Sequence, residues 1–148
     1  MEEYRGIVKG ESGMTLIEIM VVVVILGILV GIIVPRIMGR PEEARRVKAS
    51  VQIKNIGASL KLYKLDTGTY PSTEQGLDAL LQQPTVGVIP RNWNKDGYLD
   101  RVPEDPWGNP YLYLSPGVHG EYDLLSFGAD GIEGGEEKDA DIENWNLQ

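Results

Sequence analysis

The sequence predicts an α+β fold, in which a long N-terminal helix packs against a small antiparallel sheet that precedes a C-terminal loop. Three patterns carry this prediction. Apolar residues follow helical spacing up to about residue 65. Most of the 18 glycines and nine prolines come after residue 66 and divide the second half into turns and short strands. An acidic, glycine-containing segment at residues 127–142 predicts the loop.

Length and composition limit the classes of protein to which the chain can belong. Beyond its first apolar segment, the 148-residue chain keeps about 110 residues, enough for one small domain. The absence of cysteine excludes a disulfide scaffold and a thiolate metal site. A net charge of −8 argues against a nucleic-acid partner, because such binding needs a basic surface. The single histidine, His119, leaves little material for a histidine-based catalytic triad.

The first predicted element is an apolar helix at residues 14–35. Its uncharged run, apart from Glu18, holds 21 residues from 14 to 34. At about 1.5 Å rise per residue, this run measures roughly 30 Å and matches the hydrocarbon core of a bilayer. A carboxylate at that depth costs about 2.5–3.5 kcal/mol, so Glu18 needs a partner. The plain alternative is an ordinary membrane anchor that tolerates one acid near its end.

Residues 1–13 form a short polar leader that contains Arg5 and Lys9. In an ordinary secretory signal, cleavage follows the apolar segment and removes it. Here the candidate cleavage point, between Gly13 and Met14, precedes the apolar segment, which would stay with the mature chain. The two basic residues favour a cytoplasmic N-terminus, with the globular domain at residues 36–148 on the other side of the membrane.

The sequence from Gly13 through Met14-Thr-Leu-Ile to Glu18 resembles the signal of type IV prepilin-like proteins. The resemblance implies cleavage after Gly13 by a prepilin peptidase and N-methylation of Met14, although most members have phenylalanine at that position. It also implies an assembly role for Glu18, which would pair with the amino terminus of Met14 on a neighbouring subunit. Such pairing would offset much of the cost of a carboxylate in lipid.

A second helical segment is predicted after the apolar run. Pro35 is expected to kink the helix, and Pro41 suits the first turn of the next segment. This segment extends to about residue 65, and Gly68 is a plausible left-handed cap. Its apolar positions recur at spacings of three and four and predict one strip facing the core: Ala44, Val47, Val51, Ile53, Ile56, Leu60 and Tyr63.

The second half of the chain predicts short elements separated by turns. Residues 74–82 indicate a short helix with Leu77, Leu80 and Leu81 facing inward, followed by a loop at residues 83–97. Three strands are expected between turn signals, at residues 98–99, 110–114 and 122–127. The aromatic side chains expected to pack this sheet against the long helix are Trp107, Tyr111, Tyr113 and Tyr122.

Three further motifs resemble the major pseudopilins of type II secretion: GTYPSTEQGLDAL at 68–80, DPWGNPYLY at 105–113 and YDLLSFGADGIEGGEEKDADI at 122–142. The resemblance implies a pilin-like fold and a structural subunit without enzymatic activity. Such a subunit is a single-pass protein of the inner membrane of a Gram-negative bacterium, with its globular domain in the periplasm. It would polymerise into a filament that supports export of folded proteins across the outer membrane. Its implied partners are its own copies, minor pseudopilins and an inner-membrane assembly platform.

The acidic segment contains six carboxylates and is a candidate calcium site. Calcium takes about six to eight oxygen ligands, which a loop of acids and glycines can supply. Composition alone leaves two interpretations open, a metal site and a solvated acidic loop. The resemblance favours one bound calcium, with these implied ligands: the carbonyl of Phe127, Asp130, Gly135, Glu137, Asp139 and Asp141.

Two alternative functions stay open from the sequence. The first is the major subunit of a type IV pilus, although such pilins usually close their C-terminal region with a disulfide and this chain has no cysteine. The second is a membrane-anchored calcium-binding domain or enzyme. Glu104, Asp105 and Asp123 could form carboxylate pairs, but acids beside turns are commonly caps, and no nucleophile–base pair is apparent.

Overall fold

A computed structural model describes residues 13–37 and 40–147, and for residues 33–37, 40 and 138 it describes the backbone alone. The chain divides into two units, Met1–Gly39 and Arg40–Gln148. The predicted change from an N-terminal helix to a globular domain near residue 36 stays a prediction. The predicted leader at residues 1–13 lies outside the described residues, except for Gly13.

The first unit contains one helix, α1, at Leu16–Ile37. The helix continues past Pro35, whose predicted kink stays a prediction. Its apolar side chains from Leu16 to Ile32 are all exposed, the least exposed being Val22 at 44%. In the part of the chain that is described, no helix combines the length and the hydropathy that a membrane crossing requires.

The second unit is built on α2, at Arg40–Thr67. The predicted start near Pro41 and the predicted end are confirmed. Glu42 and Glu43 lie in the first turn, where acidic side chains complement the positive end of the helix dipole. Gly68 has a φ of 87° and its N–H donates to the carbonyl of Lys64 at 2.8 Å, which ends the helix as expected.

One face of α2 forms the centre of the core. Its five buried apolar side chains, none more than 2% exposed, are Ala49, Ile53, Ile56, Leu60 and Tyr63. The predicted strip was wrong at its N-terminal end, because Val47 and Val51 are 59% and 49% exposed. The reason is geometric: the spacing of three, four, three and four that leads back from Tyr63 continues to Ala49 and leaves both valines on another face.

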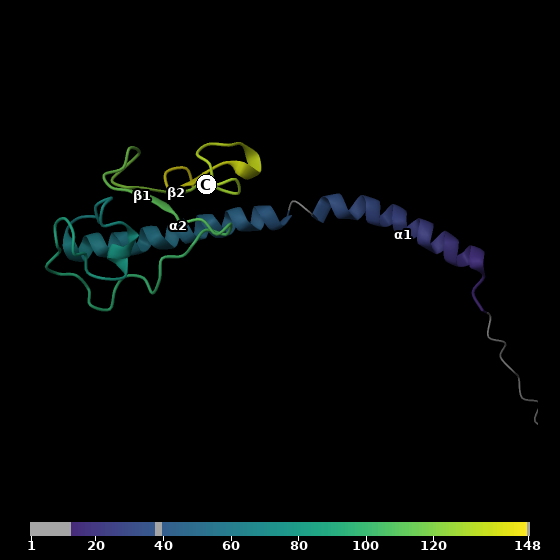
Figure 1. Ribbon diagram of the computed structural model, residues 1–148, viewed down its shortest axis with the longest axis horizontal. Coiled ribbons are helices and arrows are strands. Elements are labelled where there is room, and N and C mark those ends of the chain that lie inside the picture. Colours follow the sequence, from purple (N-terminus) through teal and green to yellow (C-terminus); the bar gives the residue numbers. More distant parts are fainter. Residues whose placement is uncertain (1–12, 38–39, 148) are drawn as a thin grey trace, which may run out of the picture. The chain divides into compact units, whose positions relative to one another are not determined.

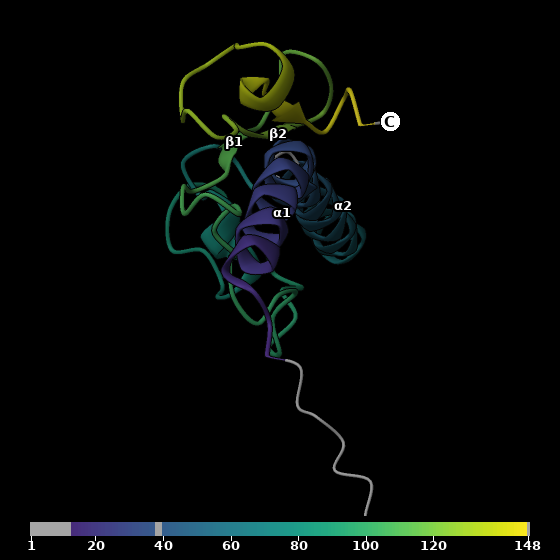
Figure 2. The ribbon, with the colours of Figure 1, turned by 90° about the vertical axis from the view of Figure 1, so that its right-hand side faces the viewer.

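A three-stranded antiparallel sheet packs along α2. It consists of β1 (Leu112–Leu114), β2 (Asp123–Ser126) and β3 (Ile142–Glu143), in the order β1-β2-β3. Leu112 pairs with Leu125, and Ser126 pairs with Ile142. Figures 1 and 2 both place β1 and β2 beside α2, and β2 and β3 contact it. The predicted strands at 110–114 and 122–127 are confirmed in shorter form, whereas β3 was not predicted.

Two predictions between α2 and the sheet need correction. The helix expected at 74–82 is a single 3₁₀ turn, η1 (Leu77–Leu80), because Gly76 takes a φ of 61° that no right-handed helix allows. The strand expected at 98–99 was wrong. The backbone N–H groups of Tyr98 and Leu99 instead donate to the carbonyl of Leu80, at 2.7 and 3.2 Å, and hold this segment against η1.

The predicted aromatic packing is confirmed. Tyr111 and Tyr113 are buried in the core, with Trp107 and Tyr122 packed against it. The hydroxyl of Tyr113 donates to the carbonyl of Pro71 at 2.8 Å, so this buried polar atom is satisfied. Burial raises the pKa of both Tyr111 and Tyr113 well above the ordinary value of 10.0.

Asp123 stabilises the turn between β1 and β2 through hydrogen bonds to the turn backbone. This carboxylate is 2% exposed and accepts hydrogen bonds from the N–H groups of Val118, at 2.8 Å, and His119, at 3.1 Å. The ring of His119 contacts the same carboxylate and stacks on Trp145, with centroids 3.9 Å apart. Burial alone would raise the pKa of Asp123, but the hydrogen bonds from Val118 and His119 outweigh it and lower the pKa below 3.8.

Leu60 and Leu62 provide a matched test of the buried face of α2. Leu60 is fully buried, whereas Leu62 is 55% exposed. We expect Leu60→Ala to lower the free energy of unfolding by about 2–5 kcal/mol, because it removes packed methyl groups and leaves a cavity. Leu62→Ala should change it by less than about 0.5 kcal/mol. Thermal melts followed by circular dichroism would measure both, and equal losses would contradict this assignment of faces.

Asp123 predicts a specific dependence of stability on pH. Because its pKa is lower in the folded chain, the unfolded chain binds a proton first as the pH falls. The stabilisation is therefore present above about pH 4 and is lost as the pH falls through the folded-state pKa. We expect the stability difference between the parent and Asp123→Asn to shrink between about pH 7 and pH 3 in urea melts. A difference that is constant over this range would contradict the prediction.

Candidate metal site and assembly helix

The N-terminus of α1 is closed by a reciprocal pair of hydrogen bonds. The N–H of Glu18 donates to the hydroxyl oxygen of Thr15 at 3.3 Å, and the N–H of Thr15 donates to a carboxylate oxygen of Glu18 at 3.4 Å. Thr15 precedes the first helical residue and Glu18 is the third, which is the arrangement of a capping box. Gly13 and Met14 lie immediately before it and are exposed.

The capping box gives Glu18 a partner within its own chain. A carboxylate in the first helical turn also interacts favourably with the helix dipole. This role was not predicted, although its signal is present in the sequence as Thr-x-x-Glu at residues 15–18, directly before an apolar run. Glu18 therefore has a function in helix initiation, whether or not a second partner binds it.

The described side chains of α1 offer an apolar surface on every side of the helix. Between Leu16 and Ile32, each large apolar residue is at least 44% exposed. Gly27 and Gly31 have open space where a Cβ would lie. A helix that is apolar all round is normally covered by protein or lipid.

Asp105 joins the turn at 105–109 to the start of the acidic segment. This carboxylate is 4% exposed and accepts hydrogen bonds from the N–H groups of Trp107 and Asn109, at 3.0 and 2.8 Å. Its other oxygen accepts from the hydroxyl of Ser126 at 2.6 Å. Asp105, like Asp123, thus caps a turn. The contacts of both carboxylates are structural, which favours the interpretation as caps over that as catalytic pairs.

After Phe127 the acidic segment folds back on itself. Gly128 and Gly135 have φ values of 69° and 89°, and Glu137 has a φ of 52°, which is uncommon for a residue with a side chain. A Cβ on Gly135 would collide with the carbonyl oxygen of Asp139, and one on Gly128 would lie 3.1 Å from that of Ala140. The close return of the chain therefore requires glycine at both positions.

Asp141 places one of its two carboxylate oxygens in a buried position. One carboxylate oxygen accepts a hydrogen bond from the N–H of Gly134 at 2.9 Å. The other oxygen, Oδ1, is buried and has no hydrogen-bond partner among the described residues. A buried carboxylate oxygen without a partner is costly, and a bound cation is one of the few groups that can satisfy it. A carboxylate next to backbone carbonyls is also the donor type that calcium prefers.

The other predicted ligands are placed less closely together. Asp130 is exposed, and its carboxylate accepts a hydrogen bond from the N–H of Ile132 at 3.2 Å. Glu137 is exposed and Asp139 is half-buried, both within the 3₁₀ turn η2 (Glu137–Asp139). Within residues 13–37 and 40–147, no three acidic or histidine side chains are grouped as in a metal site. Carbonyl oxygens would therefore have to supply much of any coordination shell.

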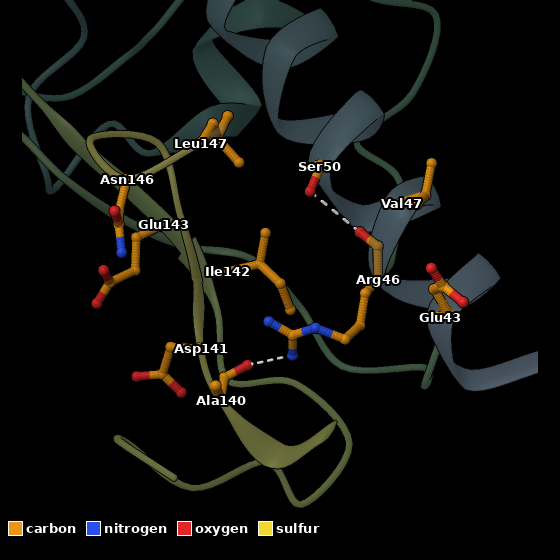
Figure 3. A pocket seen from close by; sticks show the side chains of 10 residues that line it. All are labelled: Glu43, Arg46, Val47, Ser50, Ala140, Asp141, Ile142, Glu143, Asn146 and Leu147. Atoms are coloured by element: carbon orange, nitrogen blue, oxygen red, sulfur yellow. Dashed lines mark hydrogen bonds between the residues drawn. The ribbon is translucent and has the colours of Figure 1, made fainter. Parts of the chain in front are cut away.

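A hollow of about 400 Å³ lies between the start of α2 and the segment 140–147. Figure 3 shows Arg46 reaching across it from α2, where its guanidinium donates to the carbonyl of Ala140 at 2.5 Å. Nearby, the indole N–H of Trp107 donates to the carboxylate of Glu42 at 2.7 Å. These two contacts attach the end of the acidic segment and the 105–109 turn to the first turns of α2.

Comparison with known families matches nearly the whole chain. The family "Type II secretion system (T2SS), protein G" matches residues 36–145, and the "Prokaryotic N-terminal methylation motif" matches residues 8–34. The chain is 60% identical over 138 residues to type II secretion system core protein G of Pseudomonas aeruginosa, covering 93% of this chain and 97% of that protein. For the protein of the same name from Vibrio cholerae, the identity is 51% over 140 residues, with 95% of each chain covered.

A solved structure agrees with these relatives. The crystal structure of the major pseudopilin from the type 2 secretion system of enterohaemorrhagic Escherichia coli superposes with a TM-score of 0.68. Its sequence is 43% identical, and the match covers 76% of this chain and 96% of that chain. The predicted pilin-like fold is thereby confirmed. By its family match and by the identity of its relatives, the chain belongs to the type II secretion system protein G family.

Proposed function

We propose that this chain is a major pseudopilin, a structural subunit that polymerises through α1 into the pseudopilus of a type II secretion system. In this role it supports export of folded proteins across the outer membrane and catalyses nothing itself. The observation that carries the proposal is the apolar surface of α1, exposed on all sides in a single chain of this family. Association with other copies of the helix would cover that surface.

The proposed path to the filament begins with a precursor in the inner membrane. Residues 14–34 form an apolar run whose sequence is long enough to reach across about 30 Å of hydrocarbon. A prepilin peptidase would cut after Gly13, and the new amino group of Met14 would be methylated, in keeping with the methylation motif at residues 8–34. The globular domain at residues 36–148 would then lie in the periplasm.

Glu18 is proposed to change partners on assembly. In the single chain it accepts the hydrogen bond from Thr15, a weak contact at 3.4 Å. In the filament, the amino terminus of Met14 on a neighbouring copy would supply a full opposite charge. An ion pair between desolvated groups is far less costly than a single buried carboxylate, so this pairing favours the correct register of the helices.

Calcium is proposed as the bound ion of the acidic segment. The buried oxygen of Asp141, which has no partner among the described residues, supports this. The further ligands we propose are the side chains of Asp130 and Asp139, with Glu137 and the carbonyls of Phe127 and Gly135 as additional donors. Bound calcium would supply positive charge to a segment that has six acids and one lysine.

Further partners follow from the family. Minor pseudopilins and an inner-membrane assembly platform are proposed to contact the growing filament, in addition to other copies of this chain. The sequence identity to proteins named type II secretion system core protein G favours this function over a surface type IV pilus. It likewise favours a polymerising subunit over an anchored calcium-binding domain.

Replacing Glu18 with glutamine separates the effect of the negative charge from that of the helix cap. Glutamine retains the oxygen of a capping box but cannot form the ion pair. We expect membrane-extracted Glu18→Gln chains to begin at methylated Met14 by mass spectrometry, as the parent chain does. Filaments seen by electron microscopy should fall by at least about tenfold, since the lost pairing is worth more than about 1.4 kcal/mol.

Glu74→Gln is the matched control, because Glu74 is an exposed acid of the globular unit. It should leave both processing and filaments unchanged. Normal filaments from the Glu18 variant would contradict the pairing. A parent chain that keeps Met1 and forms no filaments would contradict the proposed function as a whole.

Calcium should stabilise the parent chain through Asp141. With a Kd near 10⁻⁴–10⁻³ M, about 10 mM calcium would stabilise the fold by roughly 1.4–2.7 kcal/mol. We expect a higher Tm in calcium than in EDTA for the parent and no such rise for Asp141→Asn. Glu133→Gln, which alters an acid of the same segment outside the proposed ligands, should keep the response. Identical Tm values for the parent in calcium and EDTA would contradict the site.

A further inference from the structure

Charge is strongly segregated in the globular unit. Helix α2 carries seven basic and three acidic residues. Residues 68–148 carry four basic and fifteen acidic residues. Surfaces of opposite sign on one molecule attract each other between copies, because such complementarity guides association.

The side of α2 away from the core is apolar as well as basic. We call this surface the outer face, and its large apolar residues are Val47, Val51, Leu62 and Leu65, between 49% and 79% exposed. They recur at helical spacing and lie away from the buried row. Contiguous exposed apolar residues with a polar rim are typical of interaction surfaces.

Next to the outer face lies a hollow of about 320 Å³, which we call the lysine hollow. Its lining includes two lysines and an apolar floor: Ile53, Lys54, Gly57, Ala58, Lys61 and Tyr122. The hydroxyl of Tyr122 lies over Gly57, 2.9 Å from where a Cβ would stand. At about 300 Å³ or more, such a hollow is large enough to receive a side chain.

The acidic segment presents a complementary feature, which we call the acidic tip: Ile132, Glu133 and Glu136. Ile132 is 67% exposed, and both glutamates are exposed. None of the three belongs to the proposed calcium ligands. An aliphatic side chain flanked by carboxylates is the chemical counterpart of an apolar floor flanked by lysines.

We propose that the acidic tip of one copy docks in the lysine hollow of a second copy. Ile132 would contact the apolar floor, and Glu133 and Glu136 would pair with Lys54 and Lys61. The two surfaces differ, so the contact is heterologous. Every dimer keeps one acidic tip and one lysine hollow that can bind further copies. A heterologous contact that does not close on itself generates a helical filament.

This inference rests on the proposed function, because the contact is too small to hold two chains together unaided. Stable interfaces bury about 1,200–2,000 Å², far more than one side chain and two ion pairs can cover. Copies already linked through α1 would meet at a high effective concentration, at which a weak contact becomes populated. The docking would then set the arrangement of globular units around the filament.

Cysteine cross-linking tests the contact directly, since the chain has no native cysteine. Filaments of a chain carrying both Ala58→Cys and Ile132→Cys should give a ladder of covalent multimers with a short bismaleimide. Chains with either single change should give no ladder, and a mixture of the two single variants should give dimers alone. Ala58→Cys with Val88→Cys is the control, because Val88 is 88% exposed but lies outside the acidic tip.

Charge reversal provides a second test of the docking, measured as the yield of the cross-link between Ala58→Cys and Ile132→Cys. Lys54→Glu with Lys61→Glu, or Glu133→Lys with Glu136→Lys, should lower the yield about tenfold. All four changes on one chain should restore it. A parent ladder no stronger than the Val88 control, or no recovery in the fourfold variant, would overturn the docking while filaments still form. Absence of filaments from the parent would instead overturn the proposed function.

Discussion

The buried face of α2 is the constraint on which the globular unit depends. The three strands hold three, four and two residues, and sheets this small are not stable without a surface to pack on. Ile53, Ile56 and Leu60, each at most 1% exposed, supply that surface. The segments between the strands are then attached by specific contacts, such as that of Arg46 with Ala140. One helix face thus organises elements that are up to 94 residues apart in the chain.

The buried face takes up one side of α2, and the opposite side, with Val47, Val51, Leu62 and Leu65, is exposed. Within residues 40–148, seven of the eleven basic residues lie on α2, and fifteen of the eighteen acids lie beyond residue 67. For a monomer, this separation would bring no advantage to stability, since exposed ion pairs contribute little. For a subunit that must meet identical copies in one orientation, it gives each copy two unlike surfaces, which is the requirement of an open polymer.

Local signals in the sequence were sufficient for α2, for the glycine that ends it and for two of the three strands. Two of the errors concern contacts between distant residues. Tyr98 and Leu99 read as a strand because both are apolar, but their N–H groups bond to Leu80 of η1. β3 pairs only two residues with β2, too short a pattern to recognise. At the site, the acids were evident, whereas the burial that leaves one oxygen of Asp141 unpartnered depends on the folded chain.

The acidic segment connects the two proposed sites through its backbone. The segment has positive φ values at Gly134, Gly135 and Glu137. Ordering it in this conformation loses conformational entropy, and an ion bound at Asp141 would favour the ordered form. The acidic tip lies within the same turn of chain, so its position depends on the same ordering. If an ion orders the loop first, docking loses less conformational entropy. The coupling between ion binding and docking is reciprocal, so docking also favours ion binding. Under both proposals, calcium binds more tightly to the filament than to the single chain, because the docked tip holds the loop in the form that binds the ion.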